Sequence, residues 1–168
     1  PDVLLKELNN LGRERGQLLI SDRAHVIMPY HKLLDRGEES SKGKLMIGTT
    51  GNGIGPCYSD KASRVGIRMG DLLDDNTIIE RLEKALPRSL ALLDHYGAQN
   101  DLTIASLLDL CREWRTKLGE YITDTSLLVN KHISKGDNVL LEGAQGVHID
   151  IEYGTYPFVT SSSPTTAG

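Results

Sequence analysis

Two glycine-rich turns, each preceded by a short apolar segment, constrain the fold of this chain most. Residues 45–47 run directly into a turn at 48–56 that holds four of the 17 glycines, and residues 139–141 run into a second turn at 142–146. Short apolar segments that alternate with helical patterns are typical of α/β proteins with a largely parallel sheet. Ligands bind at the carboxyl ends of such strands, so both turns are predicted to lie at a binding site.

The spacing of apolar residues predicts the remaining elements. Helices are expected over 2–12, from Ser21 or Asp22 to Leu34 with Pro29 inside, over 58–65, 71–75 and 76–96 with Pro87 inside, and from residue 100 or 101 past Ile122 with a break at Gly119. Strands are expected at 17–20, 45–47, 139–141 and 156–159. Residues 35–44 are charged and rich in Ser and Gly, which predicts an exposed, mobile loop.

Charge and cysteine content exclude several classes of protein. Nineteen basic residues against 23 acidic ones give a net charge of -4, so we expect no nucleic-acid partner, although a local phosphate pocket is compatible with this charge. No apolar run approaches the roughly 18–20 residues of a membrane span, and no secretory signal opens the chain. Cys57 and Cys111 form no C-x-x-C pair, which predicts free thiols in a reducing compartment.

The turn at 48–56 has the chemistry of an anion-binding loop. Glycine permits a positive φ, and successive backbone N–H groups in such a turn can surround an anion. Thr49 and Thr50 add hydroxyl groups that suit a phosphate or a ribose. The alternative is a purely structural turn. The sequence contains neither G-x-x-x-x-G-K-[ST] nor the spacing of the dinucleotide-binding fingerprint.

A cationic segment follows the first turn. On a helix, Lys61, Arg64 and Arg68 would stand at i, i+3 and i+7 and would form one positively charged stripe. A bound phosphate would balance these charges, since arginine grips phosphate with paired donors. Ion pairs with Asp60 and Asp71 are the structural alternative.

The second turn presents one amide between small residues. Gln145 lies between Ala144 and Gly146, where it can donate and accept at the edge of a nucleobase or, alternatively, satisfy the backbone of its own loop. His148 and Asp150 would share one face of a strand, and we expect an ordinary hydrogen-bonded pair rather than a metal site. The other histidines are expected at the surface or satisfied in the core: His25, His31, His95 and His132.

Longer motifs carry a resemblance to a known family. Residues 53–64 match G-I-G-P-x-Y-x-x-K-x-x-R at every fixed position, and Gly48-Thr49-Thr50-Gly51 precedes them. Two further blocks follow at 142–146 and 154–162. Together these segments resemble adenylosuccinate synthetase over essentially the whole chain. The resemblance implies part of a P-loop NTPase-like synthetase fold, with a mostly parallel sheet, flanking helices and a helical middle section over 76–135.

The resemblance also implies an activity. The family is a GDP-forming carbon–nitrogen ligase that catalyses the first committed step from IMP to AMP. GTP, assisted by Mg²⁺, phosphorylates the 6-oxygen of IMP, and L-aspartate then displaces the phosphate to give adenylosuccinate. The implied enzyme is a cytoplasmic homodimer that acts on IMP, GTP and L-aspartate.

Site residues follow from the same motifs. The resemblance implies that Thr50, together with Thr49, and Thr160 bind the IMP phosphate. Arg64 would reach the IMP of the partner subunit in trans. Gln145 would contact the purine 6-position, and it is expected to be catalytic together with Lys61 of the signature. Asn52 stands where lysine or arginine is usual in the family, so one positive charge near the phosphate would be absent.

The resemblance finds no counterpart here for several family segments. These are the family's N-terminal glycine-rich loop with its catalytic aspartate and Mg²⁺ contacts, its catalytic histidine, and the segments that bind aspartate and guanine. We therefore expect residues 1–168 to be a single central fragment of a larger one-domain enzyme, without metal ligands and inactive alone. The alternatives are an inactive IMP-binding or interaction module and, less well supported, a fragment of another P-loop-like GTPase.

Overall fold

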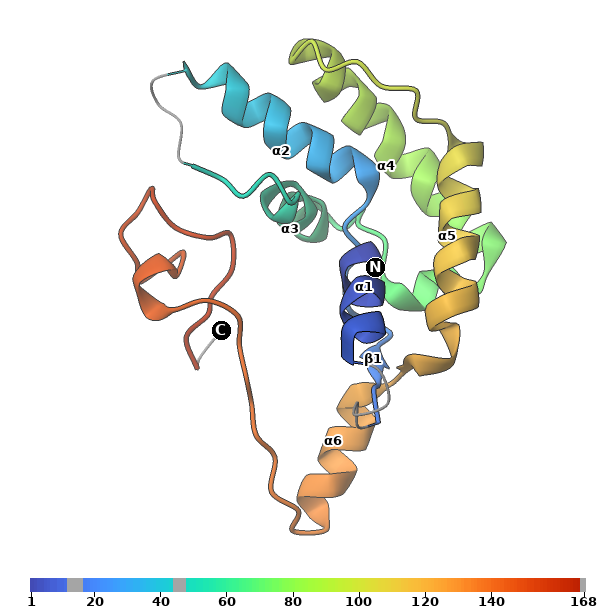
Figure 1. Cartoon of the computed structure of the whole chain (residues 1–168), viewed down its shortest axis with the longest axis vertical. Coiled ribbons are helices and arrows are strands. Elements are labelled where there is room, and N and C mark those ends of the chain that lie inside the picture. Colours follow the sequence, from blue (N-terminus) through green and yellow to red (C-terminus); the bar gives the residue numbers. More distant parts are fainter. Residues whose placement is uncertain (12–16, 44–47, 167–168) are drawn as a thin grey trace. The chain divides into compact units, whose positions relative to one another are not determined.

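Helices dominate the computed structural model, which describes residues 1–11, 17–43 and 48–166 (Figure 1). Within these residues the helices are α1 (Asp2–Leu11), α2 (Pro29–Ser41), α3 (Ile54–Ser63), α4 (Asp75–His95), α5 (Ile104–Leu118) and α6 (Thr125–Ser134). Short 3-10 turns cover η3 (Met69–Leu73), η4 (Gly119–Tyr121) and η5 (Val147–Ile149). Strands β1 (Ile20–Ser21) and β2 (Ile122–Thr123) pair in parallel, which confirms the α/β class with a small parallel sheet.

The chain divides into two compact units, each made of three segments, and one of the crossings between them falls inside α4 at Pro87. The first unit comprises Pro1–Val26, Val65–Leu86 and Asp101–Val139. Its core contains one face of α5, where apolar side chains are buried at helical spacing and η3 packs against the helix. The indole Nε1 of Trp114 on this face donates a hydrogen bond of 2.7 Å to Asp2, which ties α1 to α5.

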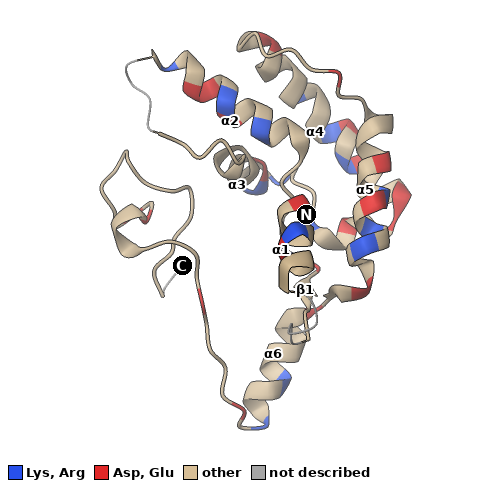
Figure 2. Ribbon diagram, viewed as in Figure 1, with Lys and Arg blue, Asp and Glu red and all other residues tan. Residues whose placement is uncertain are grey.

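Charged residues of both signs lie along α5 (Figure 2). Asp75, the first residue of α4, accepts hydrogen bonds from Arg112 at 2.6 Å and from Arg115 at 2.8 Å. These bonds, led by that from Arg112, hold the pKa of Asp75 below its usual range. The groups are partly exposed, so solvent screens this network and it orients the helices more than it stabilises them.

The second unit comprises Ile27–Arg64, Pro87–Asn100 and Leu140–Gly168. Within it, α3 packs against α2 (Figure 1). The predicted helix start at Ser21 or Asp22 is wrong, because α2 begins only at Pro29. Proline suits the first helical position, where its missing N–H would have no intrahelical partner. Ser21 belongs to β1, and its neighbour Asp22 donates a backbone hydrogen bond to Thr123.

The expected loop over 35–44 is also wrong over most of its length, because α2 continues to Ser41. Two features of the packing explain this. A Cβ at Gly37 would lie 3.0 Å from the Cβ of Tyr96, so the missing side chain permits a close approach. Asp35 and Glu39 are buried in spite of their charge because each accepts hydrogen bonds from backbone N–H groups.

The strand predictions have mixed outcomes. The segment 17–20 overlaps β1 at Ile20, and 45–47 lies outside the described residues. The predictions at 139–141 and 156–159 are wrong, since both segments lack strand structure. A strand requires a neighbour for its backbone N–H and C=O groups, and in the described part of the chain none pairs with 139–141, where Leu140 is 90% exposed.

The middle of the chain follows its predicted periodicity closely. The helix expected over 76–96 is α4, and the expected break at Gly119 is confirmed, because Gly119 caps α5 and begins η4. α5 begins two or three residues later than predicted, where Thr103 rather than residue 100 or 101 caps it by accepting a hydrogen bond from the N–H of Ser106 at 3.1 Å. Of the two short helices predicted, 58–65 overlaps the second half of α3 but extends past its end at Ser63, and 71–75 is largely the 3-10 turn η3.

No helix in the described residues is long and apolar enough to cross a bilayer. The two cysteines form no disulfide, as predicted, and both are buried, Cys57 in the second unit and Cys111 in the first. Burial raises the pKa of Cys57 to about 11, with a smaller contribution from Asp60, and it raises the pKa of Cys111 to about 12.

These two thiols are expected to resist alkylation at pH 8 and to react rapidly once urea unfolds the chain, because only the thiolate is nucleophilic. The ordinary thiol pKa is 9.0, so above pH 9 the unfolded thiol ionises first. The contribution of burial to stability is therefore complete below pH 9 and is lost as pH rises toward 11 to 12. Rates of iodoacetamide labelling at pH 8, resolved by peptide mass, measure the reactivity of the one thiol in each unit. Rapid labelling of either cysteine in the folded chain would contradict it.

Candidate functional site

The first glycine turn approaches α2 very closely. Gly53 caps α3 with a φ of 80°, in the left-handed region. A Cβ on Gly53 would lie 2.9 Å from the backbone carbon of His31 and 2.9 Å from the backbone nitrogen of Lys32. Only glycine fits this position, because both the positive φ and the neighbouring main chain exclude a side chain.

Two carboxylates of α2 bind the backbone of residues 48–53 in this turn. Oε1 of Glu39 accepts hydrogen bonds from the N–H of Gly48 at 2.5 Å and of Thr49 at 3.4 Å. Oδ2 of Asp35 accepts one from the N–H of Gly53 at 2.8 Å. Three of the backbone N–H groups that were expected to bind an anion therefore donate to carboxylates of α2 instead. Between these points the side chains of Thr49 and Thr50 are exposed.

The predicted cationic stripe is wrong, because α3 ends at Ser63. Arg64 is the C-cap residue with a φ of 64°, and its N–H donates to the carbonyl groups of Asp60 and Lys61. Arg68 lies on extended backbone at the start of η3 and belongs to the other compact unit. Lys61 is exposed in the last turn of α3, with its Nζ 5.3 Å from the centre of the Tyr58 ring.

The aspartates considered as partners of that stripe have other roles. Asp71 accepts a hydrogen bond of 2.8 Å from the backbone N–H of Arg68 and lies 3.7 Å from the guanidinium of Arg81. Asp60 is buried and bonds to His31. Both carboxylates therefore organise the ends of local elements rather than neutralise a row of cations.

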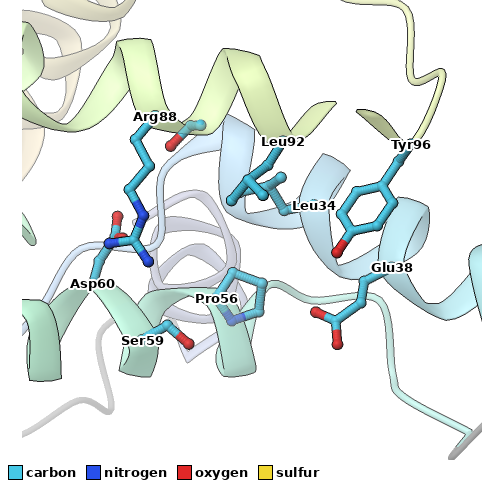
Figure 3. A pocket seen from close by; sticks show the side chains of 9 residues that line it. Leu34, Glu38, Pro56, Ser59, Asp60, Arg88, Leu92 and Tyr96 are labelled. Carbon is cyan, nitrogen blue, oxygen red and sulfur yellow. The ribbon is translucent and has the colours of Figure 1, made fainter. Parts of the chain in front are cut away.

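His31 is fully buried and satisfied, as expected of a core histidine. Its Nδ1 accepts a hydrogen bond from the N–H of Met28 at 2.9 Å, so the ring hydrogen lies on Nε2. Nε2 donates it to Oδ2 of Asp60 at 2.9 Å. Figure 3 shows Arg88 pointing from α4 toward Asp60, and its Nη1 lies 4.0 Å from Oδ1. This contact chain joins α2, α3 and α4.

A small cavity lies beside this contact chain. It measures about 100 Å³, and Figure 3 shows its lining side chains, contributed by α2, α3, α4 and Tyr96. Arg88, Ser59 and Glu38 supply polar groups, while Leu34 and Leu92 supply apolar surface. The volume is too small for a nucleotide.

The second glycine turn presents Gln145 at its tip. Gln145 has a φ of 71°, and the residue is exposed. The strand expected to pair His148 with Asp150 is instead the 3-10 turn η5. The buried carboxylate of Asp150 accepts hydrogen bonds from three backbone N–H groups, those of Glu152 at 2.8 Å, Tyr153 at 3.1 Å and Thr165 at 3.3 Å. Burial acts to raise the pKa of Asp150, but these hydrogen bonds outweigh it and hold the pKa below its usual range.

The C-terminal loops and α3, the signature helix that carries the motif at 53–64, line a larger cavity. It measures about 650 Å³ and is lined by Tyr58, residues 140–144 and residues 162–166. A Cβ on Gly55 would lie 3.3 Å from Oγ of Ser161, so the loop after Thr160 approaches the start of α3. The N–H of Thr160 donates to the carbonyl of Ile149 at 2.8 Å. Three separate motifs of the sequence therefore meet within one unit.

The predicted site residues all belong to the second compact unit: Thr49, Thr50, Lys61, Arg64, Gln145 and Thr160. The described lining of the larger cavity includes residues next to Gln145 and two positions from Thr160, but none of these six. Sequence reasoning missed Asp35, Glu39 and the bond between His31 and Asp60. The four-residue spacing of 31, 35 and 39 indicates one face of a helix, but the loop prediction over 35–44 did not take it into account.

In the ranges that the structure describes, no group of three or more His, Cys, Asp or Glu residues is arranged to hold a metal ion.

Comparison with known proteins gives consistent results. A family model described as adenylosuccinate synthetase matches residues 1–168. The chain is 48% identical to the adenylosuccinate synthetases of Streptococcus gordonii and Lactobacillus gasseri, over all of its length and 40% of theirs. A structure titled as the fully ligated adenylosuccinate synthetase of Plasmodium falciparum matches 99% of the chain and 39% of that protein, with a TM-score of 0.86 and 35% identity. The chain thus spans about 40% of the length of these relatives.

Proposed function

We propose, since the chain belongs to the adenylosuccinate synthetase family, that it supplies the IMP-binding and dimer-contact part of an enzyme that joins IMP and L-aspartate. The reaction consumes GTP and yields adenylosuccinate, GDP and phosphate. One observation carries the proposal. The signature helix and the loops that follow Thr160 and precede Gln145 surround a cavity of about 650 Å³, within the unit that holds every predicted site residue.

The proposed roles follow from side-chain chemistry. An oxo group on a purine is a poor leaving group, and phosphorylation of that oxygen makes it a good one. Gln145, exposed at the tip of its turn, can donate its amide N–H to the 6-oxygen. The hydroxyl groups of Thr49, Thr50 and Thr160 can donate to the 5′-phosphate of IMP. Lys61 adds a positive charge near the developing phosphate.

Mg²⁺ and GTP are proposed to bind mostly through residues outside this segment. The donor sets in the described residues do not fit Mg²⁺, since the carboxylates of Asp35, Glu39 and Asp150 are already directed at backbone N–H groups. The described residues therefore support nucleotide positioning rather than metal-assisted chemistry. A cytoplasmic location and a homodimer complete the proposal.

Arg64 supports the proposal of a dimer with a shared site. Its backbone is fixed in the left-handed region, and its exposed side chain leaves α3 at the C-terminal end. A guanidinium in this position can bind a phosphate on a neighbouring subunit with paired donors.

Replacing Arg64 by alanine is expected to weaken IMP binding by roughly 10- to 100-fold in the dimer, the loss typical of a hydrogen-bonded charge. In chains kept monomeric by dilution, the same change is expected to have no effect. Calorimetry with IMP at two protein concentrations, with oligomeric state checked by sedimentation, measures this. Lys84→Ala, which removes an exposed cation of α4 paired to Glu80, is the control. Equal weakening in proven monomers would exclude the role in trans.

The activity itself is tested in the complete protein that carries this chain. Production of adenylosuccinate should require IMP, GTP and L-aspartate together, and Gln145→Ala should reduce kcat by roughly 100-fold or more if the amide stabilises charge at the 6-oxygen. Binding of IMP without any turnover in the complete protein would instead indicate an inactive IMP-binding module.

A further inference from the structure

Three polar residues form one buried row along α2. His31, Asp35 and Glu39 are spaced four residues apart, so they lie on the same face of the helix. Their exposures are 0%, 6% and 8%. Charged and polar side chains are rarely buried unless each has a partner. We call these three residues the polar stripe.

Each member of the polar stripe contacts a different point of one segment, residues 48–60. Glu39 accepts the N–H of Gly48 and that of Thr49 at its start. Asp35 accepts the N–H of Gly53, at the junction of turn and helix. His31 donates to Asp60, in the last turn of α3 and next to Lys61. The segment is therefore held at its beginning, middle and end.

These contacts restrict how the segment can move. A buried carboxylate that loses its donors keeps the cost of desolvation without compensation. Displacing the turn would leave Asp35 and Glu39 in that condition. Oε2 of Glu39 is already buried without a hydrogen-bond partner among the described residues, and the ammonium Nζ of Lys42 lies 3.9 Å away. The two N–H groups on Oε1 are thus its main compensation.

We propose that the polar stripe of α2 is the positioning device of the phosphate-binding segment, setting where Thr49, Thr50 and Lys61 meet the nucleotide. The inference rests on the proposed function for the identity of the nucleotide. Asp35 and Glu39 act through the backbone of 48–53, and His31 acts through Asp60. They are positioning residues and do not touch the substrate.

Because Glu39 is charged, the direction in which IMP affinity changes tests the inference. A carboxylate near a phosphate repels it, so removing the charge alone would tighten IMP binding. Removing a positioning contact would weaken it. Glu39→Gln keeps the size of the side chain and removes the charge, and its two possible effects on affinity are opposite.

Glu39→Gln is therefore expected to weaken IMP binding by roughly tenfold, as the loss of a charge-assisted hydrogen bond implies. In the complete protein, KM for IMP should rise by a similar factor while KM for GTP changes little. Glu38→Gln is the matched control, because it removes the same charge one residue away, where the side chain is half exposed and paired to Lys42. Unchanged or tighter IMP binding by folded Glu39→Gln would overturn the proposal.

Amide hydrogen exchange separates this inference from the proposed function. Without ligand, Glu39→Gln should speed exchange at Gly48 and Thr49, and Asp35→Asn should speed it at Gly53, each leaving the other position protected. Uniform or unchanged exchange would overturn the positioning role even in a protein that binds IMP. Selective exchange in a protein that does not bind IMP would support the positioning role and reject the nucleotide. If Glu39→Gln does not fold, Asp35→Asn is titrated with IMP in its place, under the same criteria.

Discussion

Replacing Gly53 by alanine is expected to destabilise the chain by about 2–5 kcal/mol. An alanine with a φ of 80° costs about 1–2 kcal/mol relative to its ordinary conformation. The added methyl group would lie 2.9 Å from the main chain of His31 and Lys32, and overpacking of this kind costs a further 1–3 kcal/mol or so. The clashing atoms belong to the backbone of α2, so they cannot rotate away as a side chain would.

Gly97→Ala is the matched control for this prediction. Gly97 also has a positive φ, 65°, but a Cβ there would meet no atom within 4 Å. Only the conformational cost of about 1–2 kcal/mol should remain. Urea unfolding followed by circular dichroism gives both free energies. Equal losses for the two variants would show that the close approach of the turn to α2 is not energetically significant.

Replacing His31 by alanine is expected to cost about 3–5 kcal/mol, the typical effect of leaving a buried charge without its partner. The change leaves the buried Asp60 carboxylate without its donor and the N–H of Met28 without its acceptor. It also leaves a cavity in the space of a fully buried ring. Because the bond joins α2 to α3, labelling of Cys57 should accelerate more than labelling of Cys111.

The chain contains a second histidine–aspartate pair that serves as the control. Nδ1 of His132 lies 2.7 Å from Asp137, but both side chains are about half exposed. His132→Ala should therefore cost less than about 1 kcal/mol, since solvent weakens exposed pairs. Similar losses for His31→Ala and His132→Ala would mean that burial does not strengthen the first pair.

Local patterns predicted the elements whose positions depend on their own residues. α4 and the break in α5 at Gly119 follow from apolar spacing and a glycine stop. The family and its motifs follow from contiguous residues at 48–64, whose types are visible without knowledge of the fold. The burial of Cys57 agrees with the general tendency of free thiols.

Elements that depend on distant partners were not predictable from local patterns. Asp35 and Glu39 lie in a charged stretch that normally indicates a solvated loop, and their backbone donors in the 48–53 turn explain why these two carboxylates are buried on a helix. The strand prediction at 139–141 failed for the opposite reason. Its apolar residues satisfy the pattern, but strand structure also requires a paired neighbour.

The outcome for the cationic stripe in the candidate site was likewise not predictable from local spacing. The spacing of Lys61 and Arg64 suits a helix, but Arg64 adopts the left-handed conformation that ends α3. Its side chain therefore leaves the helix instead of extending a row.

The most direct test of the central claim is an NMR titration of the full chain with IMP, followed through assigned backbone amides. The account predicts saturable shifts confined to the turn at 48–53, the end of α3, the turn at 142–146 and the neighbourhood of Thr160, with the amides of α5 and α6 unchanged. Absence of saturable shifts, or shifts centred on the first compact unit, would contradict the claim that these separate motifs form one nucleotide site.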